Sequence, residues 1–264
     1  IKIMLPFLQG LRRFVCKHPV VALFFLVILA YWPIAFFQYA LLWDNIDANF
    51  PWRYIVAETL QHGVFPFWNP YQDSGYPIYA DMRSVFNPEV WIIGLTFGYS
   101  IVTMHVLMIF YLFVAGWGMY KLAHYFYQNN TIAFLGAVAF MFSGYMVQHA
   151  QDVTRIIAAA WLPWVMLYGW QMQKKPTLLN TLLTVLFLYL LITGGYLAVS
   201  FVFIYIFIFL AFYRIISSII NKEYGLFWKQ VICNLLLVVV MLFLLSPHLV
   251  TYLQAAPYVA RFEG

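Results

Sequence analysis

Charged residues are scarce in this 264-residue sequence, where Asp, Glu, Lys and Arg together make up only 9%. A soluble domain of this size carries roughly a quarter charged residues and about half apolar ones. Here 65% of the residues are hydrophobic, and several apolar runs reach or approach the roughly 20 residues needed to cross a bilayer. The composition therefore excludes a soluble protein with a large core.

Cysteine is also rare, and the two cysteines lie in different parts of the sequence. Cys16 precedes the first apolar run and Cys233 lies inside the last. These positions argue against a disulfide between them, and neither thiol marks a redox site. The net charge of +5 does not indicate nucleic-acid binding, because the basic residues are scattered at the ends of apolar runs. A signal peptide is excluded too, since the first apolar run is too long and lacks a small-residue cleavage site.

The apolar runs predict an all-α polytopic bundle of about seven transmembrane helices. The predicted spans are residues 20–43, 101–120, 132–148, 156–171, 178–194, 196–213 and 231–249. Residues 89–99 are apolar but too few to cross, so we expect an interfacial or dipping segment. The chain begins with Ile and stops soon after a span, so we expect 1–264 to be a single transmembrane domain and the N-terminal part of a longer protein.

The basic residues predict the orientation of these spans, because Lys and Arg concentrate on the cytoplasmic side. With the N-terminus in the cytoplasm, ten of the fourteen basic residues fall on that side. Those ten are Lys2, Arg12, Arg13, Lys17, Lys121, Lys174, Lys175, Arg214, Lys222 and Lys229. Eight of the nine acids face the other side or its interface. Residues 44–100 (the long loop) are then extracytoplasmic, and their concentration of polar residues predicts that function lies there.

Two carboxylates open the long loop. Asp44 directly follows the first predicted span, and Asp47 comes three residues later, so a helical turn would place both on one face. Asp44 is either a general base, made more basic by partial desolvation, or a helix cap at the interface. Asp47 is either a second catalytic carboxylate or the N-cap of an amphipathic helix expected over 52–62 and ended by Gly63.

Arginines of the loop offer sites for an anion. Arg53 and Arg83 either bind phosphate, for which a guanidinium is well shaped, or pair with Asp81 and Glu58. The sequence leaves both interpretations open.

A further polar group follows the third predicted span, at His149, Asp152 and Arg155. His149 and Asp152 are three residues apart, so they either share a helical face that lines a cavity or belong to a helix-end cluster with a local Asp152–Arg155 pair. As metal ligands, two residues at one spacing are weak evidence. His105 lies inside a span, where it is either functional or a partner in an interhelical hydrogen bond. The Gly194–Gly195 pair indicates a tight turn or close helix packing.

Short motifs stand in a fixed order over nearly the whole chain. In the long loop they are Asp44 with Pro51-Trp52, Leu60-Gln61-His62-Gly63, Phe67-Trp68-Asn69-Pro70-Tyr71, Gly75-Tyr76-Pro77 and Asn87-Pro88. Later motifs are Phe142-Ser143-Gly144-Tyr145 with His149, Leu162-Pro163-Trp164, Thr193-Gly194-Gly195-Tyr196, and Ser246-Pro247 through Pro257 to Arg261-Phe262-Glu263-Gly264.

Together these motifs resemble the bacterial YfhO family of membrane proteins. That family is similar to the GT-C glycosyltransferases. The resemblance implies a membrane enzyme that transfers a sugar from a polyprenyl-phosphate-linked donor to an envelope glycan, lipid or protein acceptor on the extracytoplasmic side. It implies Asp44, with Asp47 nearby, as the catalytic carboxylates. The substrate-binding candidates are Arg53, Asp81, Arg83, His149, Asp152, Arg155 and Arg261. No cofactor and no metal-binding residues are predicted, while the need for a divalent cation stays open.

The expected location is the bacterial cytoplasmic (inner) membrane, with membrane lipids and other membrane subunits as further partners and no nucleic acid. Two other hypotheses remain. One is a non-catalytic subunit that scaffolds an envelope complex. The other is a transporter of a lipid-linked substrate, against which the near absence of charged residues inside the spans argues.

Overall fold

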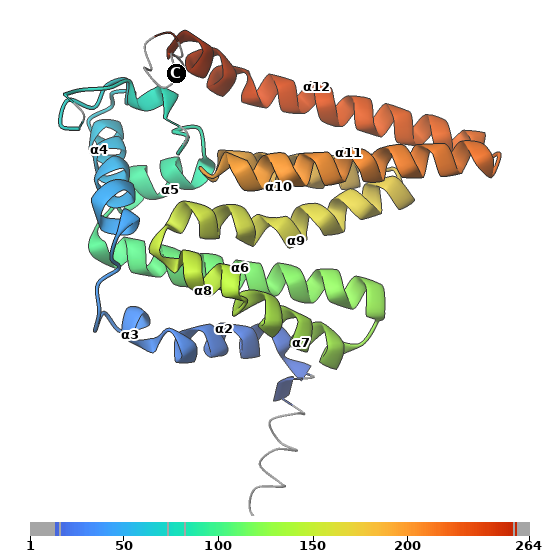
Figure 1. Cartoon of the computed structure of the whole chain (residues 1–264), viewed down its shortest axis with the longest axis horizontal. Coiled ribbons are helices and arrows are strands. Elements are labelled where there is room, and N and C mark those ends of the chain that lie inside the picture. Colours follow the sequence, from blue (N-terminus) through green and yellow to red (C-terminus); the bar gives the residue numbers. More distant parts are fainter. Residues whose placement is uncertain (1–13, 16, 73, 82, 256, 258–264) are drawn as a thin grey trace, which may run out of the picture.

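The computed structural model describes residues 14–15, 17–72, 74–81, 83–255 and 257. These residues form helices joined by turns and contain no strand, apart from one isolated bridge between Asn69 and Tyr76. The long helices lie side by side in a bundle, and the long loop lies at one end of it (Figure 1). We call this end the loop end, and the end at which α9 stops the opposite end. The all-helical prediction is thus confirmed for the described residues.

The elements follow one another along the chain as helices of very different length. They are α2 (Pro19–Ala30), α3 (Trp32–Ala35), the π-helix η1 (Asn45–Asn49), α4 (Phe50–Gln61), the 3-10 helix η2 (Ile78–Ala80), α5 (Pro88–Thr96), α6 (Ile101–Tyr127), α7 (Asn130–Met141), α8 (Gly144–Gln148), the 3-10 helix η3 (His149–Gln151), α9 (Val153–Lys174), α10 (Leu178–Thr193), α11 (Leu197–Ile220) and α12 (Tyr224–Ala255).

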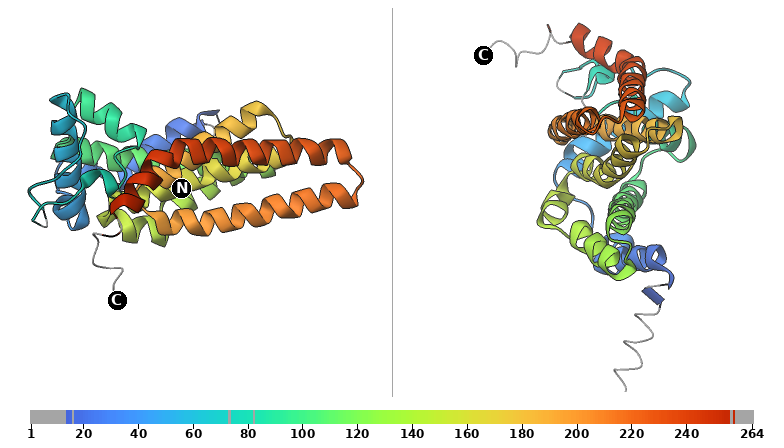
Figure 2. Two further views of the ribbon diagram at one scale, coloured as in Figure 1. Left: turned by 90° about the horizontal axis from the view of Figure 1, so that it is seen from above. Right: turned by 90° about the vertical axis from the view of Figure 1, so that its right-hand side faces the viewer.

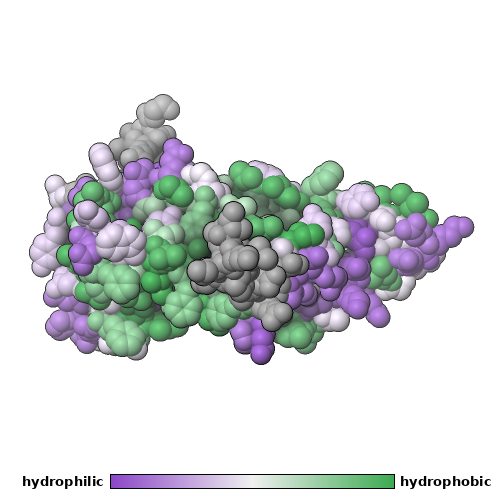
Figure 3. All heavy atoms as spheres, turned by 90° about the horizontal axis from the view of Figure 1, so that it is seen from below, coloured by the Kyte–Doolittle hydropathy of each residue, from purple (hydrophilic) through white to green (hydrophobic). Residues whose placement is uncertain are grey.

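Four helical stretches among the described residues are long and apolar enough to cross a membrane. They are α6, the stretch Asn130–Gln151 that joins α7, α8 and η3, α11 and α12. Helices α2 and α10 are apolar but shorter. Hydrophobic residues cover much of the middle of the face in Figure 3, and hydrophilic residues gather toward the end where α11 meets α12. This distribution is that of a membrane protein.

Two predicted spans are interrupted in the structure. The first helix stops at Ala30, resumes only over Trp32–Ala35, and is followed by a positive φ of 57° at Phe37. The third pauses after Met141, because Ser143 starts α8 by accepting a hydrogen bond from the amide of Met146. Hydropathy detects apolar composition but not such breaks, which depend on local hydrogen bonds.

Helices α6 and α9 form the centre of the bundle. Gly118 on α6 lies directly against the indole of Trp164 on α9, where a Cβ would clash. The Trp164 indole N–H donates to the Val114 carbonyl at 3.1 Å, so the large ring is both packed and hydrogen-bonded. Small residues facing large ones allow this close approach of two membrane helices.

A polar cluster joins three helices near the opposite end. Gln230 of α12 is fully buried, donates to the Gln173 carbonyl at 2.8 Å and accepts from Ser218 at 2.9 Å. Asn234 exchanges side-chain hydrogen bonds with Gln173. Because buried amides in an apolar setting need partners, this cluster fixes how α9, α11 and α12 pack. Helices α11 and α12 run side by side as a long antiparallel pair (Figure 2).

Candidate functional site

The start of the long loop is held against the N-terminus of α9 by two asparagines. The Asn45 side chain donates to the Ala150 carbonyl at 2.9 Å and accepts from the Val153 amide at 2.8 Å. The Asn49 side chain donates to Asp152 Oδ1 at 3.0 Å. Both asparagines are buried, so each is a specific connector between segments more than a hundred residues apart.

The two predicted catalytic carboxylates belong to this connected segment. Asp44 precedes η1 and Asp47 lies within it, and both side chains are exposed. Asp44 makes no side-chain capping hydrogen bond. The alternative of Asp47 as the N-cap of α4 is wrong, because η1 continues into that helix and Asn49 occupies the N-cap position. Among the described residues neither carboxylate is in an ion pair, which leaves both chemically available.

Asp152 starts α9 and pairs with Arg155. Its Oδ1 accepts from the Thr154 amide at 3.0 Å and the Thr154 hydroxyl at 2.6 Å, and its Oδ2 accepts from Arg155 Nε at 3.0 Å. The predicted local Asp152–Arg155 pair is confirmed. The Arg155 guanidinium lies 4.9 Å over the ring of Tyr196. Its hydrogen bonds to the described residues use only Nε, so the terminal NH₂ groups are left for an anion.

His149 does not share a helical face with Asp152, so that prediction is wrong. The 3-10 helix η3 ends at Gln151, and Asp152 is extended with φ −137°. His149 Nδ1 instead lies 2.9 Å from the Tyr145 carbonyl, and its ring packs on the Tyr145 ring with centroids 4.3 Å apart. The described residues contain no group of three His, Cys, Asp or Glu side chains that would hold a metal ion.

An apolar cavity of about 540 Å³ opens between α7–α8, α9 and α11. Its α9 wall is Ala159, Leu162 and Met166, which follow Arg155 by four, seven and eleven residues. This spacing places Arg155 on the same helix face, one turn nearer the loop end. Tyr145 and Ala198 also line the cavity, so its rim adjoins Tyr145 and the Arg155–Tyr196 contact.

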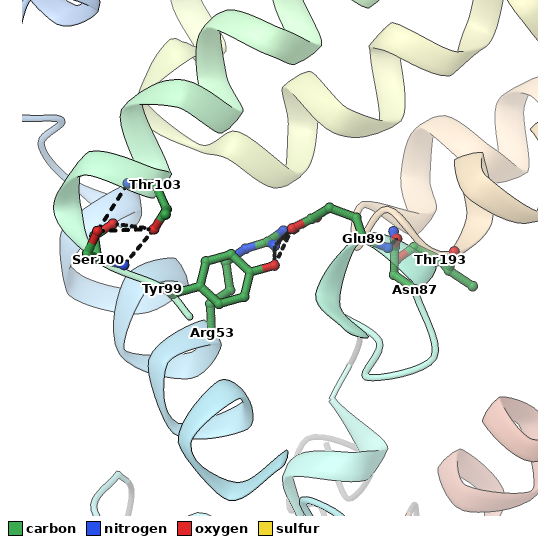
Figure 4. A network of polar contacts seen from close by, with 7 residues as sticks. All are labelled: Arg53, Asn87, Glu89, Tyr99, Ser100, Thr103 and Thr193. Atoms are coloured by element: carbon green, nitrogen blue, oxygen red, sulfur yellow. Dashed lines mark hydrogen bonds and ion pairs between the residues drawn. The ribbon is translucent and has the colours of Figure 1, made fainter. Parts of the chain in front are cut away.

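Arg53 is buried in the interior of the loop. It is only 2% exposed, and its Nη1 donates to both carboxylate oxygens of Glu89, at 2.7 and 2.8 Å, and to the Tyr99 hydroxyl at 3.0 Å (Figure 4). The Tyr99 hydroxyl also donates to Glu89. Burial alone would lower the pKa of the Arg53 guanidinium, but the adjacent Glu89 charge outweighs it and raises that pKa. Burial raises the pKa of Tyr99 despite the opposing Arg53 charge, and the Glu89 charge adds to the increase.

Arg83 forms a forked pair with Asp81, as one of the two interpretations predicted. Its Nε and Nη2 donate to the two Asp81 oxygens at 2.9 and 2.6 Å. Its Nη1 donates to the Ala48 carbonyl at 2.8 Å, which adds a third fixed point to η1. Tyr76 donates to the same carboxylate, and burial together with the Asp81 charge raises the pKa of Tyr76 to about 12.

The far end of the loop is tied to α10. Asn87 caps α5 and donates to the Thr193 carbonyl at 3.0 Å (Figure 4). The Tyr189 hydroxyl donates to the Phe86 carbonyl at 2.8 Å. The predicted turn at Gly194–Gly195 is confirmed, and Gly195 has φ +98°. The loop therefore forms a fixed cover on the bundle.

The turn at Gly195 gives the first prediction. An added Cβ there would lie 3.2 Å from the Arg83 Cα, and the positive φ disfavours any L side chain. Gly195→Ala should therefore lower the free energy of unfolding by about 1–3 kcal/mol. Thermal unfolding of the purified protein, followed by tryptophan fluorescence, measures this. Gly225→Ala is the matched control, because open space surrounds that position, and equal stability of the two variants would refute the argument.

The remaining polar residues considered are two histidines within helices, His105 and His248, and Arg261 near the C-terminal end of the sequence. His105 Nε2 accepts from the Leu41 amide at 3.2 Å. Leu41 lies in the segment between α3 and η1, so this bond is not the interhelical hydrogen bond that one interpretation predicted. The His248 ring packs edge-on against the ring of Phe86 in the long loop, with ring centroids 6.1 Å apart. Arg261 lies outside the described residues.

No protein-family model, curated protein or solved structure matches this sequence. The catalytic and substrate-binding roles given above therefore stay predictions. The roles of Asn45, Asn49 and Glu89 in holding the loop together were not predicted, because the sequence gives no signal for these residues beyond their polarity.

Proposed function

We propose that this chain is a membrane glycosyltransferase of the GT-C type, similar to the YfhO family, that uses a polyprenyl-phosphate-linked sugar. The observation that carries the proposal is the placement of Arg155 at the head of an apolar cavity, beside the segment that bears Asp44 and Asp47. A lipid donor needs these three elements together: a place for the tail, a cation for the phosphate and a carboxylate near the sugar.

The cavity suits an isoprenoid chain. Its walls are almost entirely apolar, and two of the three helical stretches around it, α7–α8 and α11, are long and apolar enough to cross a membrane. Arg155 lies one helical turn nearer the loop end, and its terminal nitrogens have no hydrogen-bond partner among the described residues. A guanidinium there both anchors the donor phosphate and offsets the negative charge that develops on it as the sugar leaves.

Asp44 is proposed as the base that takes the proton of the acceptor hydroxyl, with Asp47 as the alternative. Both are exposed at the loop end, and their segment is fixed by Asn45, Asn49 and Arg83. A rigid support of this kind favours catalysis, because small displacements of a catalytic group are costly. The acceptor then approaches from the loop end, where the polar groups lie.

The proposed topology has seven crossings and a cytoplasmic N-terminus in the bacterial inner membrane. The four long apolar helices, the short apolar α2 and α10, and the central α9 supply these crossings. The charges support the orientation: Lys121, Lys174, Lys175 and Arg214 lie at or near the opposite end, while Asp81, Glu89 and Asp152 lie at the loop end.

Arg155→Gln tests the donor class without knowledge of the sugar. Because hydrogen bonds to charged groups contribute about 1.5–3 kcal/mol, the variant should bind undecaprenyl phosphate about 10-fold to 150-fold more weakly. Arg155→Lys should recover part of the affinity, since it keeps the charge. Native mass spectrometry of the protein in detergent measures the binding.

Two controls make this test specific. Undecaprenol, which lacks the phosphate, should bind the wild type and Arg155→Gln equally, and Lys229→Gln, at the opposite end, should leave both affinities unchanged. A wild-type protein that binds no polyprenyl phosphate would contradict the proposed function, and equal phosphate binding by Arg155→Gln would remove Arg155 from the site.

A further inference from the structure

A second cavity of about 540 Å³ lies at the opposite end of the bundle, far from the site described above. Its lining residues come from the ends of α6 and α9 and the start of α10. Its wall combines aromatic rings, amides and two adjacent ammonium groups, on Phe126, Trp170, Gln128, Asn180, Lys174 and Lys175. It is therefore mixed in character, unlike the apolar cavity below Arg155.

The cations at this cavity have no carboxylate partner among the described residues. No acid lines the cavity, and the three ion pairs of the described residues all lie at the loop end. A third cation is close, because the Arg214 guanidinium lies 5.9 Å over the ring of Trp170. The Arg214 Nε is buried and has no hydrogen-bond partner within the part of the chain that the structure describes. Such a concentration of uncompensated positive charge favours an anion.

The lysines are not explained by the end of α9 alone. Basic residues often neutralise the carbonyls at a helix C-terminus. Here the Asn180 side chain donates to the Lys175 carbonyl at 2.9 Å, and the Lys175 amide donates to the Gln171 carbonyl at 2.7 Å. The Gln171 and Lys175 carbonyls thus have partners other than the lysine side chains, and both ammonium groups are exposed and available for a ligand.

The surroundings favour a lipid as the source of that anion. The cavity lies where apolar helices end, and Phe126, Leu178 and Leu179 beside it are all at least half exposed. The ring of Phe126 packs against Trp170, with centroids 5.5 Å apart. Apolar side chains beside exposed cations match the boundary between acyl chains and headgroups, where long basic side chains reach toward phosphate.

We propose that this cavity binds the phosphate-bearing headgroup of an anionic phospholipid. Lys174 and Lys175 contact the phosphate, and Trp170 and Phe126 pack against the glycerol and the upper acyl chains. The site is separate from the proposed donor site and does not depend on glycosyltransferase activity.

The test compares lipids by native mass spectrometry of the purified protein. Phosphatidylglycerol should bind the wild type at least about 10-fold more tightly than phosphatidylcholine, because the choline cation of phosphatidylcholine offsets its phosphate charge and is repelled by the two ammonium groups. The double variant Lys174→Gln/Lys175→Gln should lose this preference. The matched control Lys222→Gln/Lys229→Gln removes two exposed lysines from the same end but outside the cavity, and it should keep the preference.

Three outcomes would overturn the proposal. An equal loss of preference in both double variants would mean that general surface charge attracts the lipid. No preference in the wild type would mean that no headgroup site exists. Inorganic phosphate that displaces phosphatidylglycerol at equal concentration would assign the site to a free anion. Thermal unfolding of each variant without lipid verifies that it is folded.

Discussion

Asp44→Asn should abolish sugar transfer while the protein stays folded and still binds undecaprenyl phosphate. The substitution keeps the size of the side chain but removes the group that accepts a proton, and loss of general base catalysis costs about 10²-fold to 10⁴-fold in rate. Asp44 is exposed and makes no capping hydrogen bond, so its loss should not disturb the fold. The measurement is the sugar content of the cell envelope, with the native gene replaced by the variant.

Asp47→Asn and Glu58→Gln complete this experiment. Glu58 is an exposed acid of α4 in the same loop, so Glu58→Gln should retain full activity. A loss confined to Asp47→Asn would move the role of the base to Asp47. Full activity of both aspartate variants would contradict the catalytic assignment of the η1 segment.

Arg53→Met should cause the largest loss of stability, about 3–5 kcal/mol, because it leaves the Glu89 carboxylate buried without its partner. The pair is nearly inaccessible to solvent, with side chains 3% and 11% exposed. Thermal unfolding followed by tryptophan fluorescence reports the change, since Trp52 and Trp91 lie in the same loop cluster.

The double variant Arg53→Met/Glu89→Gln separates the charge effect from lost packing. It removes both charges, so it should be more stable than Arg53→Met alone. If the double variant were no more stable, the uncompensated charge would not be the cause. Retained binding of undecaprenyl phosphate by the folded double variant would also exclude the substrate-binding role predicted for Arg53.

Local features were accessible from the sequence. Helix α4 begins with Pro51 in its first turn and is followed by Gly63 at φ +73°, close to the predicted 52–62 helix. The Asp81–Arg83 and Asp152–Arg155 pairs join residues two and three positions apart, so their spacing was sufficient to suggest them. Where a local prediction failed, at His149 and Asp152, a break of one residue between two helices had separated the side chains.

Long-range contacts were not accessible in this way. Arg53 and Glu89 are 36 positions apart in the sequence, and Asn49 and Asp152 are 103 positions apart. A buried asparagine carries no charge and no periodic pattern, so nothing in the sequence distinguishes it from a surface asparagine. The apolar cavity below Arg155 is similarly invisible, because its lining residues on α7–α8, α9 and α11 look like any lipid-facing residues.

The scarcity of charge by itself determined that this chain is helical and built for a membrane, because each apolar run must satisfy its own backbone hydrogen bonds in lipid. The order of the residues also places six of the nine acids in the long loop. Only the tertiary structure decided which charges are buried in pairs, as Arg53 is with Glu89, and which stay available, as Asp44, Asp47 and the terminal nitrogens of Arg155 do. Availability depends on which segments meet in space, and hydropathy does not encode that.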